Sequence, residues 1–406
     1  MKFSELYVNN KRDVEKKIAT LWGGEANTAS QRAQVEKLKE QIGNIFAPED
    51  AVPVVQCMNS YKSVPSDSAD DAKKLVGKLW TFKSDPYEHQ YRCWNTLLKK
   101  NFEGKPMSIC VTTGTGSGKT ECFMMPLVQD LVEYNATHDV EGQIQALFLY
   151  PLNALMEDQK ERLEKMLAGT GIKYTVYNGD LPEREPSPND QTEDAERVRR
   201  KIAQIRGQYI DKETGEVRYK YPNMVYTRTA VRQCPPSIVL TNPTMLEYIL
   251  LRRTDEKLID SEKQSLRWVA IDETHTYTGA GAAELAMLLR RVMIAFGKDA
   301  KDVRFATSSA TFANADPNEP AEVRRAKEKE GEKKLKEFIS DLTGTSVQQV
   351  EVVDGVREGE ELLTKECPLP EEDKNRWKSI CKSDYIELDK LFPEGTVAQK
   401  LQQLDE

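Results

Sequence analysis

The sequence predicts an α/β fold in which a mostly parallel sheet is covered by helices on both faces, and three observations carry this prediction. From about residue 81, short apolar runs alternate with helix-length segments, which is the order of β-α units around a parallel sheet. The runs are mainly apolar, as expected of strands that are buried on both faces. A glycine-rich turn follows one run and a pair of acids follows another, so the chemistry is expected at the carboxyl ends of the strands.

The chain before these units has a helical pattern. Residues 3–22 and 30–46 carry apolar side chains at helical spacing, and a Gly-Gly pair separates them. The stretch from 47 to 85, which includes Pro53, Pro65 and a Ser/Asp cluster at 66–71, is predicted to be irregular. We therefore expect residues 1–80 to form a helical N-terminal accessory region, and the sequence does not indicate its function.

Six apolar runs are the predicted strands of the sheet: 107–112, 144–150, 173–177, 237–241, 267–271 and 303–307. The interval 181–236 is longer than an ordinary loop, so it is predicted to be a charged insertion with a basic helix at 197–206. These boundaries give one α/β domain over 81–345. Residues 346–406 are acidic and are predicted to be a linker or the start of a following domain.

The turn after the first predicted strand has the pattern of a phosphate-binding loop. It comprises Thr113, Gly114, Thr115, Gly116, Ser117, Gly118, Lys119 and Thr120, and a helical pattern begins at its end. The glycines let successive N–H groups converge on an anion at a helix N-terminus. The Lys119 ammonium is expected to contact the β and γ phosphates, and Thr120 to ligate Mg²⁺. Thr113 stands where the consensus loop begins with glycine; a Ser/Gly-rich surface turn is the weaker alternative, because a strand precedes this turn and a helix follows it.

Two adjacent carboxylates, Asp272 and Glu273, follow the apolar run at 267–271. Asp272 is expected to hold the hydration shell of Mg²⁺, and Glu273 to orient and deprotonate a water that attacks the γ-phosphate. Two acids after a strand are by themselves equally typical of a solvated strand end, but the loop upstream favours the catalytic interpretation. We therefore predict Lys119, Asp272 and Glu273 as catalytic residues, with ATP and Mg²⁺ as cofactors.

Charge is sorted along the chain. The net charge is −8, so nucleic-acid contacts are expected from a local patch rather than from the overall field. Residues 197–232 hold ten basic against three acidic side chains, whereas 178–196 hold seven acids and one arginine. Seven scattered cysteines without a Cys-x-x-Cys pair, and only three histidines, argue against a zinc site or a disulfide framework. No apolar run of membrane-spanning length and no signal pattern occur, so we expect a cytoplasmic protein without a membrane partner.

Taken in order, the motifs resemble those of superfamily 2 helicases of the DEAD/DEAH type over roughly residues 85–345. Besides the loop, the matching segments are Tyr87-Glu-His89-Gln90, Tyr150-Pro151-Leu-Asn153, Tyr177-Asn-Gly179-Asp180, Leu240-Thr241-Asn242-Pro243, Asp272-Glu273-Thr274-His275 and Ser309-Ala310-Thr311. The resemblance implies a RecA-like domain in which Tyr87 and Gln90 bind the adenine. The implied nucleic-acid contacts are Pro151, Asn153, Gly179, Thr241 and Asn242. The implied coupling residues, which link ATP hydrolysis to movement on the nucleic acid, are His275, Ser309 and Thr311.

Finer features resemble a bacterial subgroup that contains the MrfA-type repair helicases and the helicases of the DISARM and Druantia anti-phage systems. They are Thr227-Arg228-Thr229, the segment 242–250, and Thr276-Tyr277-Thr-Gly279 followed by Leu288-Leu289-Arg290-Arg291. The resemblance implies single-stranded or forked DNA as the partner and 3′-to-5′ translocation. Arg228 and Arg232 adjoin the backbone motif and are DNA candidates, although a structural role is equally open.

A helicase of this type needs two RecA-like domains, with ATP between them and arginines from the second. After Gly344 the sequence has no further β-α series and no Gln-x-x-Gly-Arg-x-x-Arg segment, so the second domain is expected downstream or on a partner chain. We predict the ATP-binding half of an ATP-dependent DNA helicase or translocase that acts in repair or anti-phage defence. The alternatives are a nucleotide-gated DNA-binding or assembly subunit without unwinding activity, and an RNA helicase.

Overall fold

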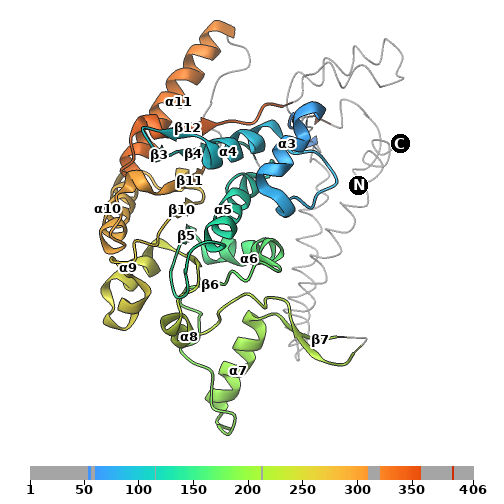
Figure 1. Ribbon diagram of the computed structural model, residues 1–406, viewed down its shortest axis with the longest axis vertical. Coiled ribbons are helices and arrows are strands. Elements are labelled where there is room, and N and C mark those ends of the chain that lie inside the picture. Colours follow the sequence, from blue (N-terminus) through green and yellow to red (C-terminus); the bar gives the residue numbers. More distant parts are fainter. Residues whose placement is uncertain are drawn as a thin grey trace, which may run out of the picture. The chain divides into compact units, whose positions relative to one another are not determined.

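A computed structural model (Figure 1) describes residues 54–55, 60–114, 116–211, 214–309, 321–357 and 386–387. Contacts divide the chain into two units, one of them Tyr61–Arg357 and the other Met1–Ser60 with Glu358–Glu406. In the second unit, β1 (Val54–Val55) pairs antiparallel with β13 (Ile386–Glu387). The helices predicted at 3–22 and 30–46 lie outside the described residues.

The Tyr61–Arg357 unit is built around a seven-stranded sheet in which every pairing is parallel. Its strands, in spatial order, are β12 (Val350–Val353), β4 (Ser108–Val111), β11 (Arg304–Ser308), β10 (Trp268–Ile271), β5 (Ala146–Leu149), β9 (Ile238–Thr241) and β6 (Tyr174–Val176). Six of these strands coincide with predicted apolar runs, which confirms the predicted α/β class. The seventh, β12, pairs with β4, so the sheet continues past the predicted boundary at 345.

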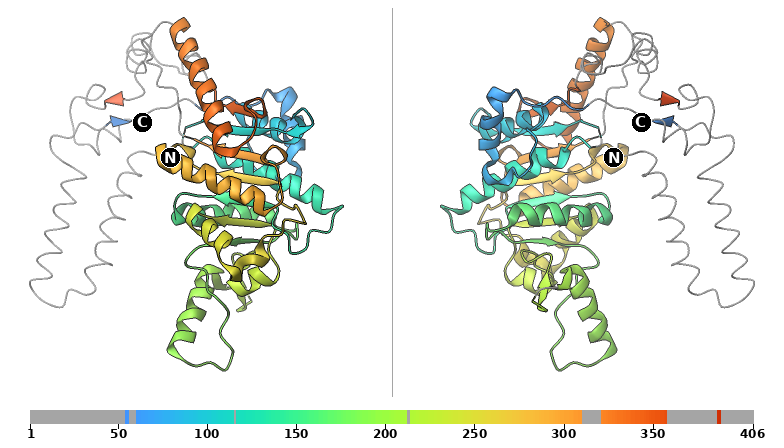
Figure 2. Two further views of the ribbon diagram at one scale, coloured as in Figure 1. Left: turned by 90° about the vertical axis from the view of Figure 1, so that its left-hand side faces the viewer. Right: turned by 90° about the vertical axis from the view of Figure 1, so that its right-hand side faces the viewer.

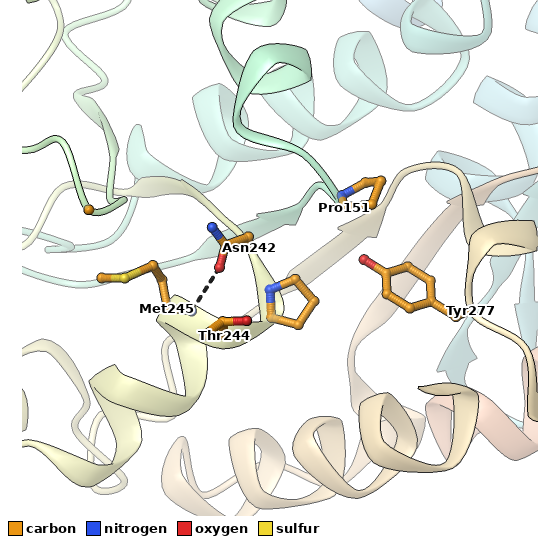
Figure 3. A pocket seen from close by; sticks show the side chains of 7 residues that line it. Pro151, Asn242, Thr244, Met245 and Tyr277 are labelled. Carbon is orange, nitrogen blue, oxygen red and sulfur yellow. Dashed lines mark hydrogen bonds between the residues drawn. The ribbon is translucent and has the colours of Figure 1, made fainter. Parts of the chain in front are cut away.

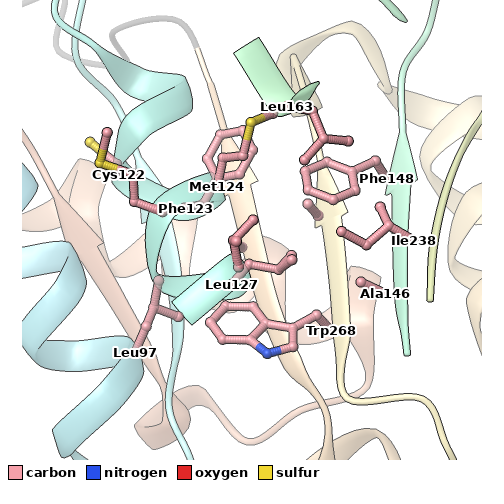
Figure 4. Packing of buried hydrophobic residues seen from close by; sticks show 14 of the residues in the cluster. Leu97, Cys122, Phe123, Met124, Leu127, Ala146, Phe148, Leu163, Ile238 and Trp268 are labelled. Carbon is pink, nitrogen blue, oxygen red and sulfur yellow. The ribbon is translucent and has the colours of Figure 1, made fainter. Parts of the chain in front are cut away.

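Successive residues of the central strands face two separate cores. Ala146 and Phe148 of β5 pack in one cluster, and Leu147 and Leu149 pack in the other, as the alternation of side chains along a strand requires. Helices α4 (Glu88–Lys99), α5 (Lys119–Asn135) and α6 (Asn153–Leu167) cover the first face. Figure 4 shows Phe123 and Leu127 of α5 against Phe148 and Trp268. Helices α9 (Pro243–Leu251) and α10 (Gly279–Ala295) cover the second face (Figure 2).

The segment predicted to be irregular between 47 and 85 contains a helix, α3 (Ser66–Val76), so that prediction was wrong. Pro65 precedes the helix, Asp67 lies in its first turn and two lysines lie in its last turn. These are the residues that helix termini prefer. Ala69, Ala72 and Val76 are buried at spacings of three and four. The Ser/Asp cluster is therefore the start of an amphipathic helix.

The insertion folds into short elements between β6 and β9. It holds α7 (Glu193–Ile205), a hairpin of β7 (Gln208–Ile210) and β8 (Val217–Tyr219), and α8 (Arg228–Gln233). The Thr192 hydroxyl caps α7 by accepting from the Ala195 N–H. Three acids occupy the first turn of α7, where the helix dipole favours negative charge, and the predicted basic residues follow.

The remaining elements are short or lie at the sheet margin. They are the 3₁₀ turns η2 (Gly77–Leu79), η3 (Arg253–Leu258), η4 (Thr274–Thr276), η5 (Ala300–Asp302) and η6 (Val347–Gln349), the pair β2 (Asn101–Phe102) and β3 (Lys105–Pro106), and α11 (Ala321–Thr343). Leu335 and Ile339 of α11 pack on Cys110 and Val350. Within the described part of the chain, no helix has the length and apolar character needed to cross a membrane.

Candidate functional site

The order of the strands places the predicted motifs in two neighbouring groups. The phosphate-binding loop follows β4, Ser309 follows β11 and the acid pair follows β10, and these three strands are adjacent. The adjacent strands β5, β9 and β6 lead to Pro151, Asn242 and Gly179. Because all the strands are parallel, their carboxyl ends lie at one edge of the sheet. The expected nucleotide residues occupy one half of this edge, and the expected nucleic-acid residues occupy the other.

The phosphate-binding loop passes from β4 into α5 through backbone conformations that favour glycine. Gly118, the N-cap of α5, has φ 73° and ψ 36°, and Gly116 has φ 74°. The buried hydroxyl oxygens of Thr113 and Ser117 lie 2.5 Å apart in a hydrogen bond. Thr113 thus closes the loop with its side chain where the consensus has glycine. Thr115, another predicted loop residue, lies outside the described residues.

Two side chains at the start of α5 can receive a ligand. Neither the Lys119 ammonium nor the Thr120 hydroxyl forms a hydrogen bond or ion pair with another described residue. A lysine and a threonine beside the N–H groups of a helix N-terminus are the donors that a polyphosphate and its Mg²⁺ require. The residues therefore fit ATP with Mg²⁺. The loop and Lys119 would hold the phosphates, and Thr120 and Asp272 would hold the ion.

Ser308, at the end of β11, joins the two acids to the neighbouring strand. Its hydroxyl donates to Oδ1 of Asp272 and accepts from the Glu273 N–H at 3.0 Å. Glu273 has φ 52° and ψ 48°, a left-handed conformation that is uncommon for residues with a side chain. The Thr274 hydroxyl fixes this turn by donating to the Ser308 carbonyl at 2.7 Å. Strained backbone of this kind clusters at functional sites.

The predicted coupling residues lie against the nucleotide elements where the structure describes them. Nδ1 of His275 is 3.2 Å from Oε2 of Glu273. The Ser309 N–H donates to the Val111 carbonyl at 2.9 Å, directly before the phosphate-binding loop. The buried Ser309 hydroxyl has no partner among the described residues. Thr311 lies outside the part of the chain that is described.

The two predicted adenine-binding residues, Tyr87 and Gln90, lie at the start of α4. Oε1 of Gln90 accepts from the Tyr87 N–H at 3.0 Å, and its Nε2 donates to the Gly118 carbonyl at 3.4 Å. An amide side chain has two donor hydrogens and two lone pairs on its oxygen. One N–H and one lone pair of Gln90 thus remain, and this is the combination that reads N6 and N7 of adenine.

His89 supports the loop from the same helix. Its Nε2 lies 2.8 Å from the Ser117 carbonyl, so Nε2 carries the proton. Burial, and to a smaller degree the charge of Arg92, lower the pKa of His89. The ring is therefore neutral near pH 7, and its buried Nδ1 is an acceptor without a partner among the described residues.

A hollow of about 490 Å³ opens at the second half of the edge (Figure 3). Its lining consists of Pro151, Gly179, Asn242, Pro243, Thr244, Met245 and Tyr277. The Asn242 side chain accepts from the Met245 N–H at 2.8 Å and donates to Oδ1 of Asn153 at 3.0 Å. Asn242 thus caps α9 and links it to the start of α6. The N-terminus of α9 thus lies at this hollow, and helix N-termini favour anions.

Tyr277 lines the hollow on the side of the acid pair. Burial, together with the charge of Asp272, raises the pKa of Tyr277 to about 12. Its hydroxyl makes no hydrogen bond with the other described residues. The Tyr277 N–H donates to the Thr274 carbonyl at 3.1 Å, so one short turn connects the acid pair to the hollow.

Three other predicted nucleic-acid residues form hydrogen bonds or ion pairs within the protein. Arg228 donates to the carbonyls of Leu181 and Asn178 at 3.1 and 2.8 Å. Arg232 is paired with Asp255 and Glu183. The hydroxyl of Thr241 is buried and donates to the Tyr177 carbonyl at 2.8 Å. All three hold the loop after β6 in place, and none of them lines the hollow.

Sequence reasoning missed two residues that organise the nucleotide half. Ser308 precedes the predicted coupling segment, and its only sequence signal is a polar pair at the end of an apolar strand. Tyr61 lies in the predicted accessory region, yet its hydroxyl accepts from the Gly114 N–H at 2.9 Å. Nothing in the local sequence around Tyr61 marks this contact, because its partner is more than fifty residues away.

Comparison with known proteins gives consistent matches. The family model described as DEAD/DEAH box helicase matches residues 87–206. The Druantia protein DruE of Escherichia coli (strain UMEA 4076-1) is 23% identical over 379 residues, covering 76% of this chain and 20% of DruE. The uncharacterized ATP-dependent helicase YprA of Bacillus subtilis (strain 168) is 28% identical over 230 residues, covering 56% of this chain and 23% of YprA.

A crystal structure of the DUF1998 helicase MrfA bound to DNA matches with a TM-score of 0.43 and 24% identity. The match covers 78% of this chain and 34% of that chain. This chain spans about a fifth of the length of the two curated relatives.

Proposed function

We propose that this chain, which contains a DEAD/DEAH box helicase domain, is the ATP-binding half of an ATP-dependent DNA helicase or translocase. One observation carries the proposal. The phosphate-binding loop and the acid pair, at the ends of β4 and β10, share a sheet edge with a hollow at the ends of β5 and β9. A single edge thus offers a polyphosphate site and a phosphodiester site side by side.

In the nucleotide half, each residue has a separate task. The backbone of the loop and Lys119 bind and orient the phosphates. Asp272 and Thr120 would hold Mg²⁺, which supplies charge neutralisation on the phosphates when it is bound. The Glu273 carboxylate orients a water and accepts its proton. Ser308 holds both acids in position through its two hydrogen bonds.

The second half of the edge binds the nucleic acid. Pro151, Gly179 and Asn242 line the hollow, and Asn153 supports Asn242. The turn from Thr274 to Tyr277 gives a direct mechanical connection to Glu273. On the other side, Ser308 contacts both acids, and the next residue, Ser309, donates to the Val111 carbonyl at the end of β4. Occupation of the hollow can therefore change the position of the catalytic carboxylate.

We further propose that the substrate is DNA and that the protein acts in repair or anti-phage defence. Both proposals rest on the resemblance of the Thr227–Thr229 and Thr276–Gly279 segments to the bacterial helicase subgroup. A RecA-like domain of this type closes on ATP against a second one, which supplies arginines. We place that second domain downstream or on a partner chain. The accessory region is then the part of the chain before Tyr61, since Tyr61–Arg357 form one compact unit, and the residues after Arg357 include the passage toward the second domain.

The test is ATP hydrolysis by the 406-residue chain with and without single-stranded DNA, beside Glu273→Gln. DNA-stimulated turnover that the substitution abolishes would support a catalytic site completed by self-association. ATP binding without turnover would identify the chain as half of a motor. If the wild type binds neither ATP nor DNA, the proposal fails.

Binding and unwinding assays on the same chain distinguish this proposal from two alternative functions. A nucleotide-gated DNA-binding or assembly subunit would change its DNA affinity with ATP but never unwind a fork, even with a second RecA-like domain present. An RNA helicase would prefer RNA in competition binding at a fixed salt concentration, because the 2′-hydroxyl offers contacts that DNA lacks.

A further inference from the structure

Tyr61 contacts the phosphate-binding loop from outside the predicted motifs. The side chain is buried, and its hydroxyl oxygen accepts a hydrogen bond from the Gly114 N–H at 2.9 Å. Gly114 adjoins Thr113, whose hydroxyl closes the loop on Ser117. The phenol therefore fixes the loop backbone at the point where the chain leaves β4.

Arg357 contacts both the hydroxyl and the ring of Tyr61. Its guanidinium donates to the Tyr61 hydroxyl at 3.0 Å and lies 4.3 Å from the ring centroid. The two residues form an antiparallel bridge, and the Lys62 N–H donates to the Val356 carbonyl at 2.8 Å. The segment that enters this unit and the segment that leaves it therefore meet beside the loop.

The Tyr61 ring is also fixed by the predicted adenine segment. Its centroid lies 5.1 Å from that of His89, edge to face, and 5.8 Å from that of Tyr87. Aromatic pairs at such separations are attractive. His89 in turn binds the Ser117 carbonyl, so the ring connects the two segments that the nucleotide would touch.

Gly355 shows how tightly the ring is enclosed. A Cβ at this position would lie 2.5 Å from Cε1 of Tyr61 and 2.7 Å from Cγ2 of Thr113. Separations this short cannot be tolerated without displacing the ring or the loop. Glycine is therefore required at 355 for Tyr61 to reach Gly114.

We propose that Tyr61, held by Arg357, is a positioning residue of the nucleotide site, and that its hydroxyl presets the loop to receive the phosphates. This inference rests on the proposed ATP binding. A loop that is ordered before the ligand arrives loses less conformational freedom on binding, which raises affinity without a new ligand contact. The gain in affinity is expected only for ligands whose phosphates bind in the loop, and not for the nucleoside alone.

The experiment measures the Kd of ADP by isothermal titration and of adenosine by competition, using the full chain with Tyr61→Phe. Phenylalanine keeps the ring contacts and removes the hydroxyl. We expect the Kd of ADP to rise about tenfold, the effect of one hydrogen bond, and the Kd of adenosine to stay unchanged. Tyr248→Phe, at an exposed tyrosine of α9, is the matched control and should bind ADP as the wild type does.

A second variant separates this role from simple stability. Gly355→Ala should displace the Tyr61 ring and raise the Kd of ADP, as Tyr61→Phe does. The thermal unfolding midpoint of Tyr61→Phe should stay close to that of the wild type. Wild-type ADP affinity in Tyr61→Phe, or an equal loss for ADP and adenosine, would overturn the inference. If the wild-type chain binds no ADP, the proposed function falls as well, whereas binding lost only in Lys119→Ala leaves that function standing and refutes the role of Tyr61.

Discussion

At the residue scale, the Lys119 ammonium is the charge on which nucleotide binding depends. It has no ion-pair partner among the described residues, so it can serve the phosphates. We expect Lys119→Ala to weaken ATP binding by about 100-fold, the upper range for charged hydrogen bonds, in fluorescence titration with a labelled ATP analogue. Glu273→Gln should retain the affinity and lose turnover. If the wild type and Lys119→Ala bind ATP equally well, the loop is not the phosphate-binding site.

His89 makes the stability of the nucleotide half sensitive to acid. Burial, and then Arg92, lower its pKa in the folded protein, so the unfolded chain takes up the proton more readily. The stabilising contribution is therefore complete above the unfolded pKa of about 6.5 and declines as the pH falls below it, toward the lower folded pKa. Urea unfolding between about pH 8 and pH 5 should show the free-energy difference between the wild type and His89→Gln shrinking as the pH falls. Parallel curves would contradict this prediction.

Residues were predictable where their chemistry is local in sequence. Short local motifs identify the glycines of the loop, Lys119 and the acid pair. The strand order then brings these motifs together in space. Ser308 and Tyr61 were not predictable, because their partners come from distant segments. Arg228 and Arg232 were attractive because of their charge, yet the fold directs them to carbonyls and carboxylates.

At the element scale, burial decided what the sequence could reveal. The six predicted strands are buried throughout or nearly so, so their apolar runs were plain. β12 contains Glu351, whose carboxylate accepts from Thr96 and Lys100. Because of this charge, the edge strand was predicted to be part of a linker. α3 was missed because its polar first turn resembles a loop.

Replacing glycine by alanine is expected to have opposite effects on stability at two positions, one just after a helix and one inside a helix. Gly297, just after α10, has φ 60°, and a Cβ there would lie 2.2 Å from the Ser261 carbonyl oxygen. Gly297→Ala should lower the free energy of unfolding by about 2 kcal/mol or more, since both the backbone and the contact are strained. Gly331 lies inside α11, and a Cβ there would meet no described heavy atom within 4 Å beyond its chain neighbours and the backbone of its own helix. Gly331→Ala should raise stability by about 0.5 to 1 kcal/mol.

Chemical denaturation of the two variants beside the wild type measures this difference directly. The same atoms are added in both cases, so the comparison isolates the backbone conformation and the surroundings. Destabilisation of equal size in both variants would show that the turn after α10 is less constrained than its contact with Ser261 indicates.

At the scale of the whole molecule, the charge distribution limits how the protein can hold DNA. The net charge is −8, and all seven residues that line the hollow are uncharged. Several basic side chains of residues 197–232 form ion pairs with acids at the surface. Lys201 pairs with Asp180, Arg197 pairs with Asp194, and Lys220 pairs with Glu161. Binding is therefore expected to depend on helix N-termini and polar groups more than on lysine and arginine.

This distribution predicts a shallow salt dependence for single-stranded DNA. Each phosphate neutralised by a cation adds about 0.7 to the slope of log affinity against log salt, so two or three such contacts give a slope of about −2. Fluorescence anisotropy with labelled oligo(dT) between about 50 and 300 mM salt measures it. Arg200→Ala, at an exposed position of α7, should leave both affinity and slope unchanged. A slope of about −5, reduced by Arg200→Ala, would instead place the DNA along the basic insertion and leave the hollow to another ligand.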